Sequence, residues 1–172
     1  MSVYAARLIA ALILVFVTVP ATAADALFRS SFESSICDQY TFAQEPNDLI
    51  VLYDSVVLDS SRAAIVCGTL SVADNVDYFR ISVAITSTAL IETIVSDGVS
   101  CPGGPMSLTF YDASFTSIAT NAGGGTGGCA SLDAMSSPVL QNLPPGNYYI
   151  RVTQSVFDPA DTPPYALNIR LF

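Results

Sequence analysis

Hydrophobic and polar residues alternate one by one in three segments of the chain, and this pattern predicts β-strands. Successive side chains of a strand point to opposite faces, so alternation over six or seven residues indicates a strand that is half buried. The predicted inward residues are Phe79, Ile81 and Val83 in segment 77–83; Tyr148, Ile150 and Val152 in segment 148–153; and Tyr165, Leu167, Ile169 and Leu171 in segment 165–171.

Shorter apolar segments separated by turn residues extend this pattern along the chain. Turn signals rich in Gly, Pro, Asn and Asp lie between them, and no long window after residue 24 shows helical spacing. Many short strands at this spacing are typical of an all-β, antiparallel β-sandwich. The further predicted strands are 50–58, 64–70, 88–95, 106–111, 115–120 and 138–143.

The N-terminal segment 1–23 has the features of a secretory signal peptide. Arg7 precedes an apolar run from Leu8 to Val19, and small residues follow up to Ala23. The alternative is a membrane anchor, but a run of about 12 residues spans only about 18 Å as a helix, short of the roughly 30 Å of hydrocarbon. We therefore expect export to the periplasm or the medium, with no membrane span after cleavage.

Cleavage leaves about 150 residues, enough for one domain with its own core. Segment 24–42, rich in serine and acidic residues, is predicted to be a leader, and 43–172 the β-sandwich domain. The formal net charge is −9, and all six basic residues are arginine. Such an acidic chain repels phosphate backbones, so we expect no binding to nucleic acid. The absence of basic clusters argues equally against binding to anionic membrane surfaces.

Four cysteines follow the signal peptide, and an even number in an exported chain favours two disulfides. Three pairings are possible. We favour Cys37–Cys67 and Cys101–Cys129, because each closes a local loop of about 30 residues worth roughly 3–4 kcal/mol. The alternatives are four buried thiols or a zinc site, and the scattered spacing and the absence of histidine disfavour zinc.

The composition leaves little scope for catalysis. The chain has no histidine and no lysine, which removes the commonest general base and the Ser–Lys dyad. A pair of carboxylates of the glycosidase type stays formally open. Asp74 and Asp77 lie close in sequence, but both precede a strand rather than facing each other across a cleft. We expect no enzyme activity.

Two groups of oxygen-bearing side chains stand just before predicted strands: Glu45, Asn47 and Asp48 in one group, and Asp74 and Asp77 in the other. Carboxylate and amide oxygens are ligands of Ca²⁺, which takes six to eight oxygens. Asn and Asp are also common turn residues for conformational reasons alone. The spacing by itself leaves both interpretations open.

Several motifs, in order along residues 43–172, resemble the bacterial pre-peptidase C-terminal domain. That family has Glu-Pro-Asn-Asp early, then Gly-x-Ile/Leu, then Asp-x-Asp-Tyr-Phe, an apolar strand ending in Tyr-Asp, and two closing tyrosine-bearing strands. The matching segments are Glu45-Pro46-Asn47-Asp48, Cys67-Gly68-Thr69-Leu70, Asp74-Asn75-Val76-Asp77-Tyr78-Phe79, Leu108-Thr109-Phe110-Tyr111-Asp112, Gly146-Asn147-Tyr148-Tyr149-Ile150-Arg151-Val152 and Tyr165-Ala166-Leu167.

The resemblance implies a jelly-roll-like β-sandwich that accompanies secreted proteases and other exported enzymes. Related collagen-binding domains of bacterial collagenases bind calcium through their N-terminal acidic segment and an Asp-x-x-Asp turn. Where those relatives often carry one more acid, this chain has Ala43. Carried over by position, the implied calcium ligands are Glu45, Asn47, Asp48, Asp74 and Asp77.

Taken together, these features predict a secreted, non-catalytic accessory or binding module, for which the resemblance implies stabilisation by calcium. Its expected partner is an extracellular or periplasmic protein or polysaccharide, although the absence of tryptophan weakens the usual carbohydrate-stacking site. The alternatives are a structural or chaperone-like partner of another exported protein and, less favoured, a carboxylate-dependent hydrolase.

Overall fold

The structure is a computed structural model, and the description below covers residues 37, 40–71, 75–94, 106–123, 128–154 and 164–172. By its contacts the chain divides between residues 32 and 33, and every described residue lies in the C-terminal unit. The predicted signal peptide and most of the predicted leader therefore lie outside the described residues. Within the described part, no helix is long and apolar enough to cross a membrane.

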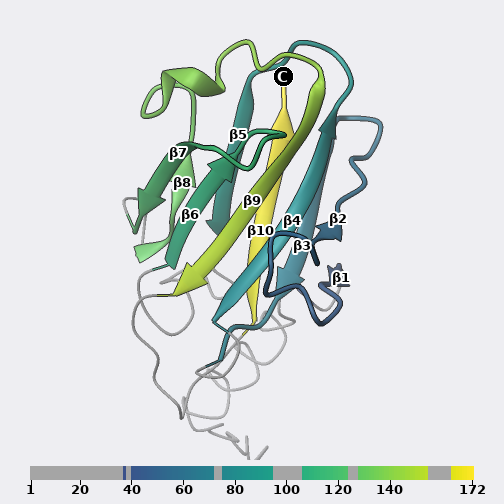
Figure 1. Cartoon of the computed structure of the whole chain (residues 1–172), viewed down its shortest axis with the longest axis vertical. Helices are drawn as coiled ribbons and strands as arrows, with labels where there is room; N and C mark the ends of the chain where they lie inside the picture. The colour runs from purple at the N-terminus through teal and green to yellow at the C-terminus, as the bar shows by residue number, and fades with distance from the viewer. Residues whose placement is uncertain (1–36, 38–39, 72–74, 95–105, 124–127, 155–163) are drawn as a thin grey trace, which may run out of the picture. The chain divides into compact units, whose positions relative to one another are not determined.

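The described residues form two five-stranded sheets that pack face to face. In Figure 1, β9 and β4 lie in front of β10, so the second sheet faces the viewer. The first sheet has the order β1 (Thr41–Phe42), β3 (Ala63–Gly68), β10 (Tyr165–Leu171), β5 (Ala89–Ile94) and β8 (Ser131–Leu132). The second has the order β2 (Asp54–Ser55), β4 (Val76–Val83), β9 (Gly146–Gln154), β6 (Met106–Tyr111) and β7 (Ser117–Ala122).

The alternating pattern of the sequence forms the core between the sheets. Phe79 and Ile81 of β4, Ile150 of β9, and Leu167 and Ile169 of β10 are all fully buried. Their side chains belong to one apolar cluster that includes residues of both sheets. The predicted inward sets of the three alternating segments are therefore confirmed.

The chain passes repeatedly from one sheet to the other. Among the described strands, β3, β4, β5 and β6 alternate between the first and second sheets, and so do β8, β9 and β10. This alternation, with antiparallel pairing of the long strands, confirms the predicted β-sandwich. The sheets are mixed rather than purely antiparallel, because the short edge strands β1 and β2 run parallel to β3 and β4.

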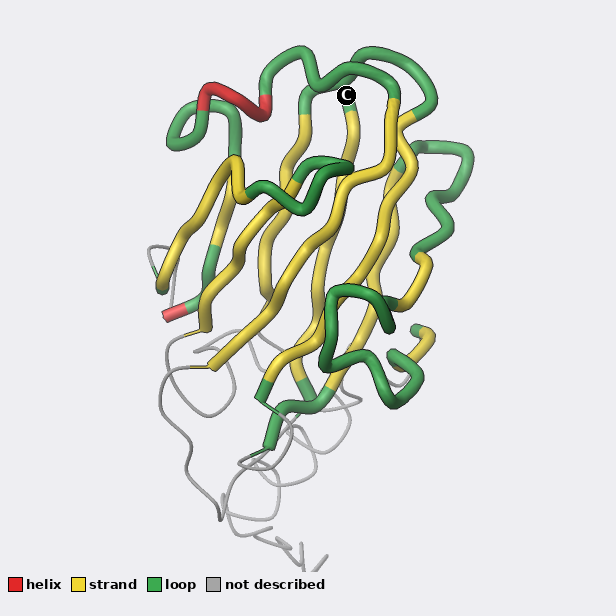
Figure 2. Tube along the Cα trace, viewed as in Figure 1, coloured by secondary structure: helices red, strands yellow, loops and turns green. Residues whose placement is uncertain are grey.

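The predicted strand 138–143 is wrong. Pro138 begins a 3-10 helix, Pro138–Leu140, which is drawn as the red turn near the upper edge of Figure 2. Proline fixes its own φ and lacks the N–H that a strand ladder needs, which favours the first turn of a helix over a strand. The apolar residues there are buried by the turn instead: Leu140 and Leu143 are at most 2% exposed.

Other strand boundaries also differ from the prediction. Most of segment 50–58 is turn and irregular structure, and only Asp54–Ser55 forms a strand. The two-residue strands β1 and β8 were not expected, because two residues are too few to show an alternation. The predicted strand 115–120 is shifted to Ser117–Ala122, since residues 112–116 form a turn closed by the carboxylate of Asp112.

Candidate cation-binding site

The segment that carries Glu45 and Asn47 crosses from the first sheet to the second. At its start, the Ala43 N–H donates to the Cys67 carbonyl at the end of β3, at 2.7 Å. At its end, the Tyr78 N–H of β4 donates to the Asn47 carbonyl, at 2.9 Å. The two backbone hydrogen bonds therefore hold residues 43–47 across the end of the sandwich, next to Asp77.

Asp77 is fully buried although it carries an ionisable carboxyl group. It points inward from β4, and the hydroxyl of Tyr165 on β10 donates a hydrogen bond to Asp77 Oδ2. Gly68 at the end of β3 makes room for this contact, because a Cβ atom there would lie 2.6 Å from Asp77 Oδ2. Three strands from two sheets thus meet at this carboxylate.

Asn47 is also fully buried, and its side chain lies between two carboxylates. Its amide oxygen faces only acceptors. With amide oxygen and nitrogen exchanged, the nitrogen donates to Asp77 Oδ1 at 3.1 Å and to Glu45 Oε2 at 3.1 Å. The Glu45 carboxylate also accepts the Asn47 backbone N–H at 3.2 Å. The structure therefore brings together Glu45, Asn47 and Asp77, three of the five residues that the family resemblance implies as ligands.

The other two predicted ligands are placed differently. Asp48 follows the buried Asn47 directly, but its side chain is exposed. Asp74 lies outside the described residues. Among the residues that the structure describes, no group of three or more Asp, Glu, His or Cys side chains is arranged to hold a metal ion. The candidate site thus consists of two carboxylates and one amide, with Glu45 open to solvent.

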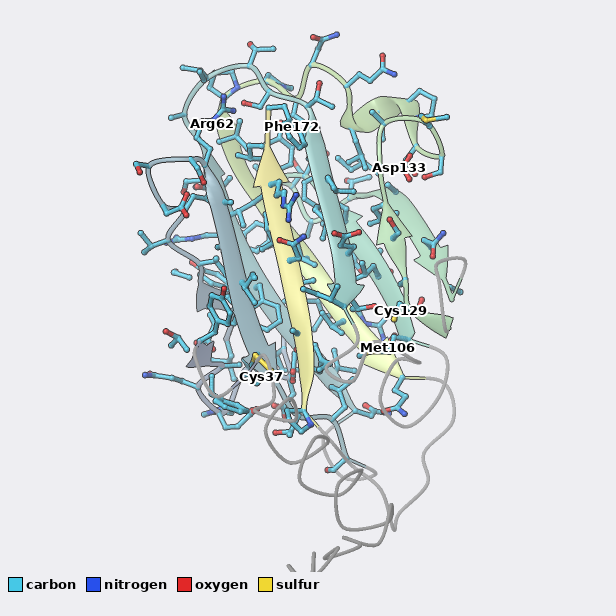
Figure 3. The ribbon with its side chains drawn as sticks, turned by 180° about the vertical axis from the view of Figure 1, so that it is seen from behind. Cys37, Arg62, Met106, Cys129, Asp133 and Phe172 are labelled. Carbon is cyan, nitrogen blue, oxygen red and sulfur yellow. A yellow bond between two sulfur atoms is a disulfide. The ribbon has the colours of Figure 1, made fainter. Side chains whose placement is uncertain are left out.

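A disulfide joins Cys37 to Cys67, immediately before Gly68, and confirms the first predicted pair. Its sulfur atoms pack on Ala166 of β10, with Ile65 and Ile94 around them. Cys129 is also disulfide-bonded, and its predicted partner, Cys101, lies outside the described residues. In the view from behind, Cys37 and Cys129 are labelled on opposite sides of β10 (Figure 3). None of the described cysteines is free.

Two members of the cluster were not predicted from the sequence. Tyr165 was assigned to the core as an apolar residue, and Gly68 was noted only as part of a motif. A tyrosine at an inward position of a strand is itself a signal, because a buried tyrosine hydroxyl usually finds a hydrogen-bond partner. A glycine at a strand end similarly marks close approach by another group.

An open groove lies between the short edge strands β1 and β2. It has a volume of about 430 Å³ and is lined by residues of β1, β2, β3 and the residues that follow β2, with Phe42, Val57 and Ile65 among them. Asp54 at its rim accepts a hydrogen bond from the Gln44 N–H. The groove contains no second acidic or basic side chain, so it has no pair of ionisable groups for acid–base chemistry.

No protein-family model matches the chain, and no curated protein sequence does. Among solved structures, it is similar to the pre-peptidase C-terminal domain of collagenase from Bacillus anthracis, with 17% identity, a TM-score of 0.45, and coverage of 70% of this chain and 94% of that one. It is also similar to PliG of Aeromonas hydrophila, a periplasmic inhibitor of g-type lysozyme (14% identity, TM-score 0.39, coverage 70% and 96%). PliG of Salmonella Typhimurium, an inhibitor of the same type, has 12% identity, a TM-score of 0.38, and coverage of 69% and 96%. The domain that the sequence motifs resemble is thus among the similar solved structures, and the similarity concerns the fold.

Proposed function

We propose that this chain is a secreted or periplasmic, non-catalytic accessory or binding module whose N-terminal segment is held in place by Ca²⁺. The observation that supports the cation is the contact of the buried Asn47 side chain with one carboxylate oxygen of Glu45 and one of Asp77, at the end of the sandwich. The oxidising compartment is supported by the Cys37–Cys67 disulfide and by the signal-peptide pattern of residues 1–23.

The separation of the side-chain atoms fits a calcium shell. The position that the Asn47 amide oxygen occupies is about 3.1 Å from one carboxylate oxygen of Asp77 and one of Glu45. Two oxygens that each lie about 2.4 Å from Ca²⁺ are roughly 3 Å apart when they occupy neighbouring positions of its shell. With the amide oxygen in this position, both carboxylate oxygens repel it unless a cation lies beside them.

The two orientations of the Asn47 amide suit two states of the site. Without a cation, the amide nitrogen turns inward and donates to both carboxylates. With a cation, the amide oxygen turns inward and becomes a ligand, while the Tyr165 hydroxyl keeps its bond to Asp77 Oδ2. Because Glu45 is exposed, water and backbone carbonyls are available to complete the shell.

The chemistry of the described residues favours a structural role for this site over a catalytic one. Asp77 is fully buried, and Tyr165 already donates to one of its oxygens, so it is poorly placed to exchange protons with a substrate. The chain has no histidine or lysine to act as a base beside it. We therefore infer that this cluster stabilises the fold and that the module binds its ligand at another surface.

Terbium luminescence tests the cation site directly. Tb³⁺ replaces Ca²⁺ in oxygen sites, and with no tryptophan in the chain its sensitised emission must come from tyrosine. The ring of Tyr165 is held against Asp77, so bound Tb³⁺ is expected to luminesce on tyrosine excitation and to be displaced by Ca²⁺.

The matched variants are Glu45→Gln at the site and Glu92→Gln on β5, where the carboxylate accepts a hydrogen bond from Asn168. Each removes one negative charge. Glu45→Gln should weaken the Ca²⁺-displaceable signal by about tenfold or more, and Glu92→Gln should leave it unchanged. Equal loss in both variants, or no displaceable signal in the unmodified chain, would contradict the proposal.

A further inference from the structure

The outer face of the second sheet carries tyrosine and arginine side chains on neighbouring strands. On β4, Tyr78 and Arg80 point away from the core, and on the adjacent β9 so do Tyr149 and Arg151. The register places Arg80 opposite Tyr149 and Tyr78 opposite Arg151. Tyr111 of β6 continues the first of these rows, opposite Tyr149. We call these five residues the Tyr–Arg face; it is the side of the second sheet turned toward the viewer in Figure 1.

The aromatic rings of this face pack on one another. Tyr149 lies between Tyr53 and Phe115, with ring centroids at 5.1 and 4.7 Å, and is only 8% exposed. Phe115 itself is 42% exposed, so the cluster presents an apolar edge to solvent. Tyr149 is therefore covered by the turn after β6 and by the segment before β2.

The Arg80 guanidinium is oriented by Tyr53. Arg80 donates to the Tyr53 hydroxyl at 3.1 Å, and its guanidinium carbon lies 4.9 Å from the centre of the Tyr53 ring. Nε of Arg151 is buried and has no hydrogen-bond partner within the described residues. The rings of Tyr78 and Tyr111 approach to 6.4 Å across β9, and burial raises the pKa of the Tyr78 hydroxyl, which stays protonated at neutral pH.

The charge of this face is opposite to that of the whole chain. The outward positions of β4, β9, β6 and β7 include two arginines and no Asp or Glu, although the chain as a whole has a formal net charge of −9. The acidic residues next to the face are already engaged: Asp112 accepts the Ser114 and Thr116 N–H groups, and Asp54 accepts the Gln44 N–H. The face therefore offers guanidinium donors with no carboxylate of its own strands beside them.

We propose that the Tyr–Arg face is the docking surface of the module and that its partner is a protein segment bearing carboxylates beside apolar side chains. This inference rests on the proposed role as a binding module. Arginine and tyrosine dominate the binding energy of protein interfaces, where Lys, Asp and Glu are depleted. Guanidinium groups bind carboxylates as paired donors, and the tyrosine rings and the Phe115 edge supply apolar area around them.

The test uses a short peptide that alternates glutamate and leucine, and a counterpart with glutamine in place of glutamate. Binding of the full mature chain is measured at low salt, and again at high salt where exposed charges are screened. We expect the glutamate peptide to bind, the glutamine peptide to bind about tenfold more weakly, and salt to remove the difference. Polygalacturonate serves as the acidic polysaccharide; if it binds and the peptide does not, the protein partner is wrong.

Three variants locate the binding surface. Arg80→Gln on the face is matched by Arg170→Gln, which removes the same charge from the exposed end of β10 in the other sheet. Thr109→Glu places a carboxylate opposite Arg151 without altering an arginine. We expect about tenfold weaker peptide binding for Arg80→Gln and Thr109→Glu, with both variants still folded at the temperature of the assay, and no change for Arg170→Gln.

Two outcomes of the variant series would also overturn the proposal. One is equal loss in the Arg80 and Arg170 variants, which indicates attraction by overall charge. The other is loss of binding on Val57→Ser, in the groove beside β2, with Arg80→Gln unaffected. The Tb³⁺ signal is read on the same samples, so failure of the docking surface is distinguished from failure of the cation site.

Discussion

The hydroxyl of Tyr165 on β10 donates a hydrogen bond to the buried carboxylate of Asp77 on β4, and this bond joins the two sheets of the sandwich. Both side chains are at most 1% exposed. Asn47 contacts the other carboxylate oxygen, so the N-terminal segment is tied to the same point. The contact between the sheets and the candidate site therefore share one carboxyl group.

Removing the Tyr165 hydroxyl should destabilise the protein. Tyr165→Phe leaves Asp77 Oδ2 without this donor in a buried position, and such a loss costs about 1–3 kcal/mol. Urea unfolding measures the change. Tyr148→Phe is the control, since the Tyr148 hydroxyl donates to the Pro144 carbonyl in a part-buried position and should matter less. Equal losses in the free energy of unfolding would show that the Tyr165–Asp77 hydrogen bond contributes no more than the Tyr148–Pro144 one.

Adding a methyl group at residue 68 should push against the Asp77 carboxylate. The Cβ of Gly68→Ala would lie 2.6 Å from Asp77 Oδ2, and overpacking of this kind costs about 1–3 kcal/mol. At Gly146, the start of β9, the nearest atom to an added Cβ is Tyr148 Cε2 at 3.8 Å, an ordinary contact. Thermal unfolding should therefore show a marked loss for Gly68→Ala and little for Gly146→Ala. A tolerated Gly68→Ala would mean that the cluster rearranges freely.

The Cys37–Cys67 disulfide should contribute several kcal/mol to stability. It closes a separation of 30 residues and anchors Cys37 on the outer face of the first sheet. The chain-entropy estimate for such a loop is about 3–4 kcal/mol. A Cys37→Ser, Cys67→Ser double variant should lose that amount in urea unfolding, measured without reductant. Unchanged stability would indicate that the segment before β1 contributes nothing to the folded domain.

Alkaline pH should destabilise the fold through Tyr78. Burial is the main cause that raises the pKa of its hydroxyl above the ordinary value of 10.0. A group whose pKa is raised on folding stabilises the fold fully below its unfolded pKa, and this contribution is lost as pH rises through the folded pKa. The melting temperature of the unmodified chain should therefore fall more steeply above about pH 10 than that of Tyr78→Phe. Parallel pH profiles would contradict this assignment.

The long strands were predictable because their core and solvent faces differ at every second residue. The inward residues of β4, β9 and β10 follow directly from that alternation. Segment 138–143 was misassigned because its apolar residues carry no periodicity that distinguishes a turn from a strand, and Pro138 decides the outcome. The parallel edge strands β1 and β2 depend on tertiary pairing over two residues, which no local pattern encodes.

For the candidate site, the sequence indicated which oxygen-bearing side chains take part, but it did not indicate which other residues contact them. The resemblance supplied Glu45, Asn47 and Asp77, and the structure brings these three together. Tyr165 is 88 residues from Asp77 along the chain, so its hydroxyl contact needed the three-dimensional fold. The same holds for the Tyr–Arg face, whose arginines become neighbours of tyrosines only through the register of β4 and β9.

Thermal melting of the mature chain in EDTA, in millimolar Ca²⁺ and in matched Mg²⁺ tests the central claim most directly. An extracellular site of this type is expected to bind Ca²⁺ with a Kd of about 10⁻⁴–10⁻³ M. At ten times Kd the gain is about 1.4 kcal/mol, which corresponds to a rise of a few degrees in melting temperature. Ca²⁺ should raise the melting temperature of the unmodified chain and of Glu92→Gln, with less effect from Mg²⁺ and a much smaller rise in Glu45→Gln. An unchanged melting temperature in saturating Ca²⁺, or an equal rise with Mg²⁺ and in Glu45→Gln, would show that Glu45, Asn47 and Asp77 stabilise the fold by hydrogen bonding alone.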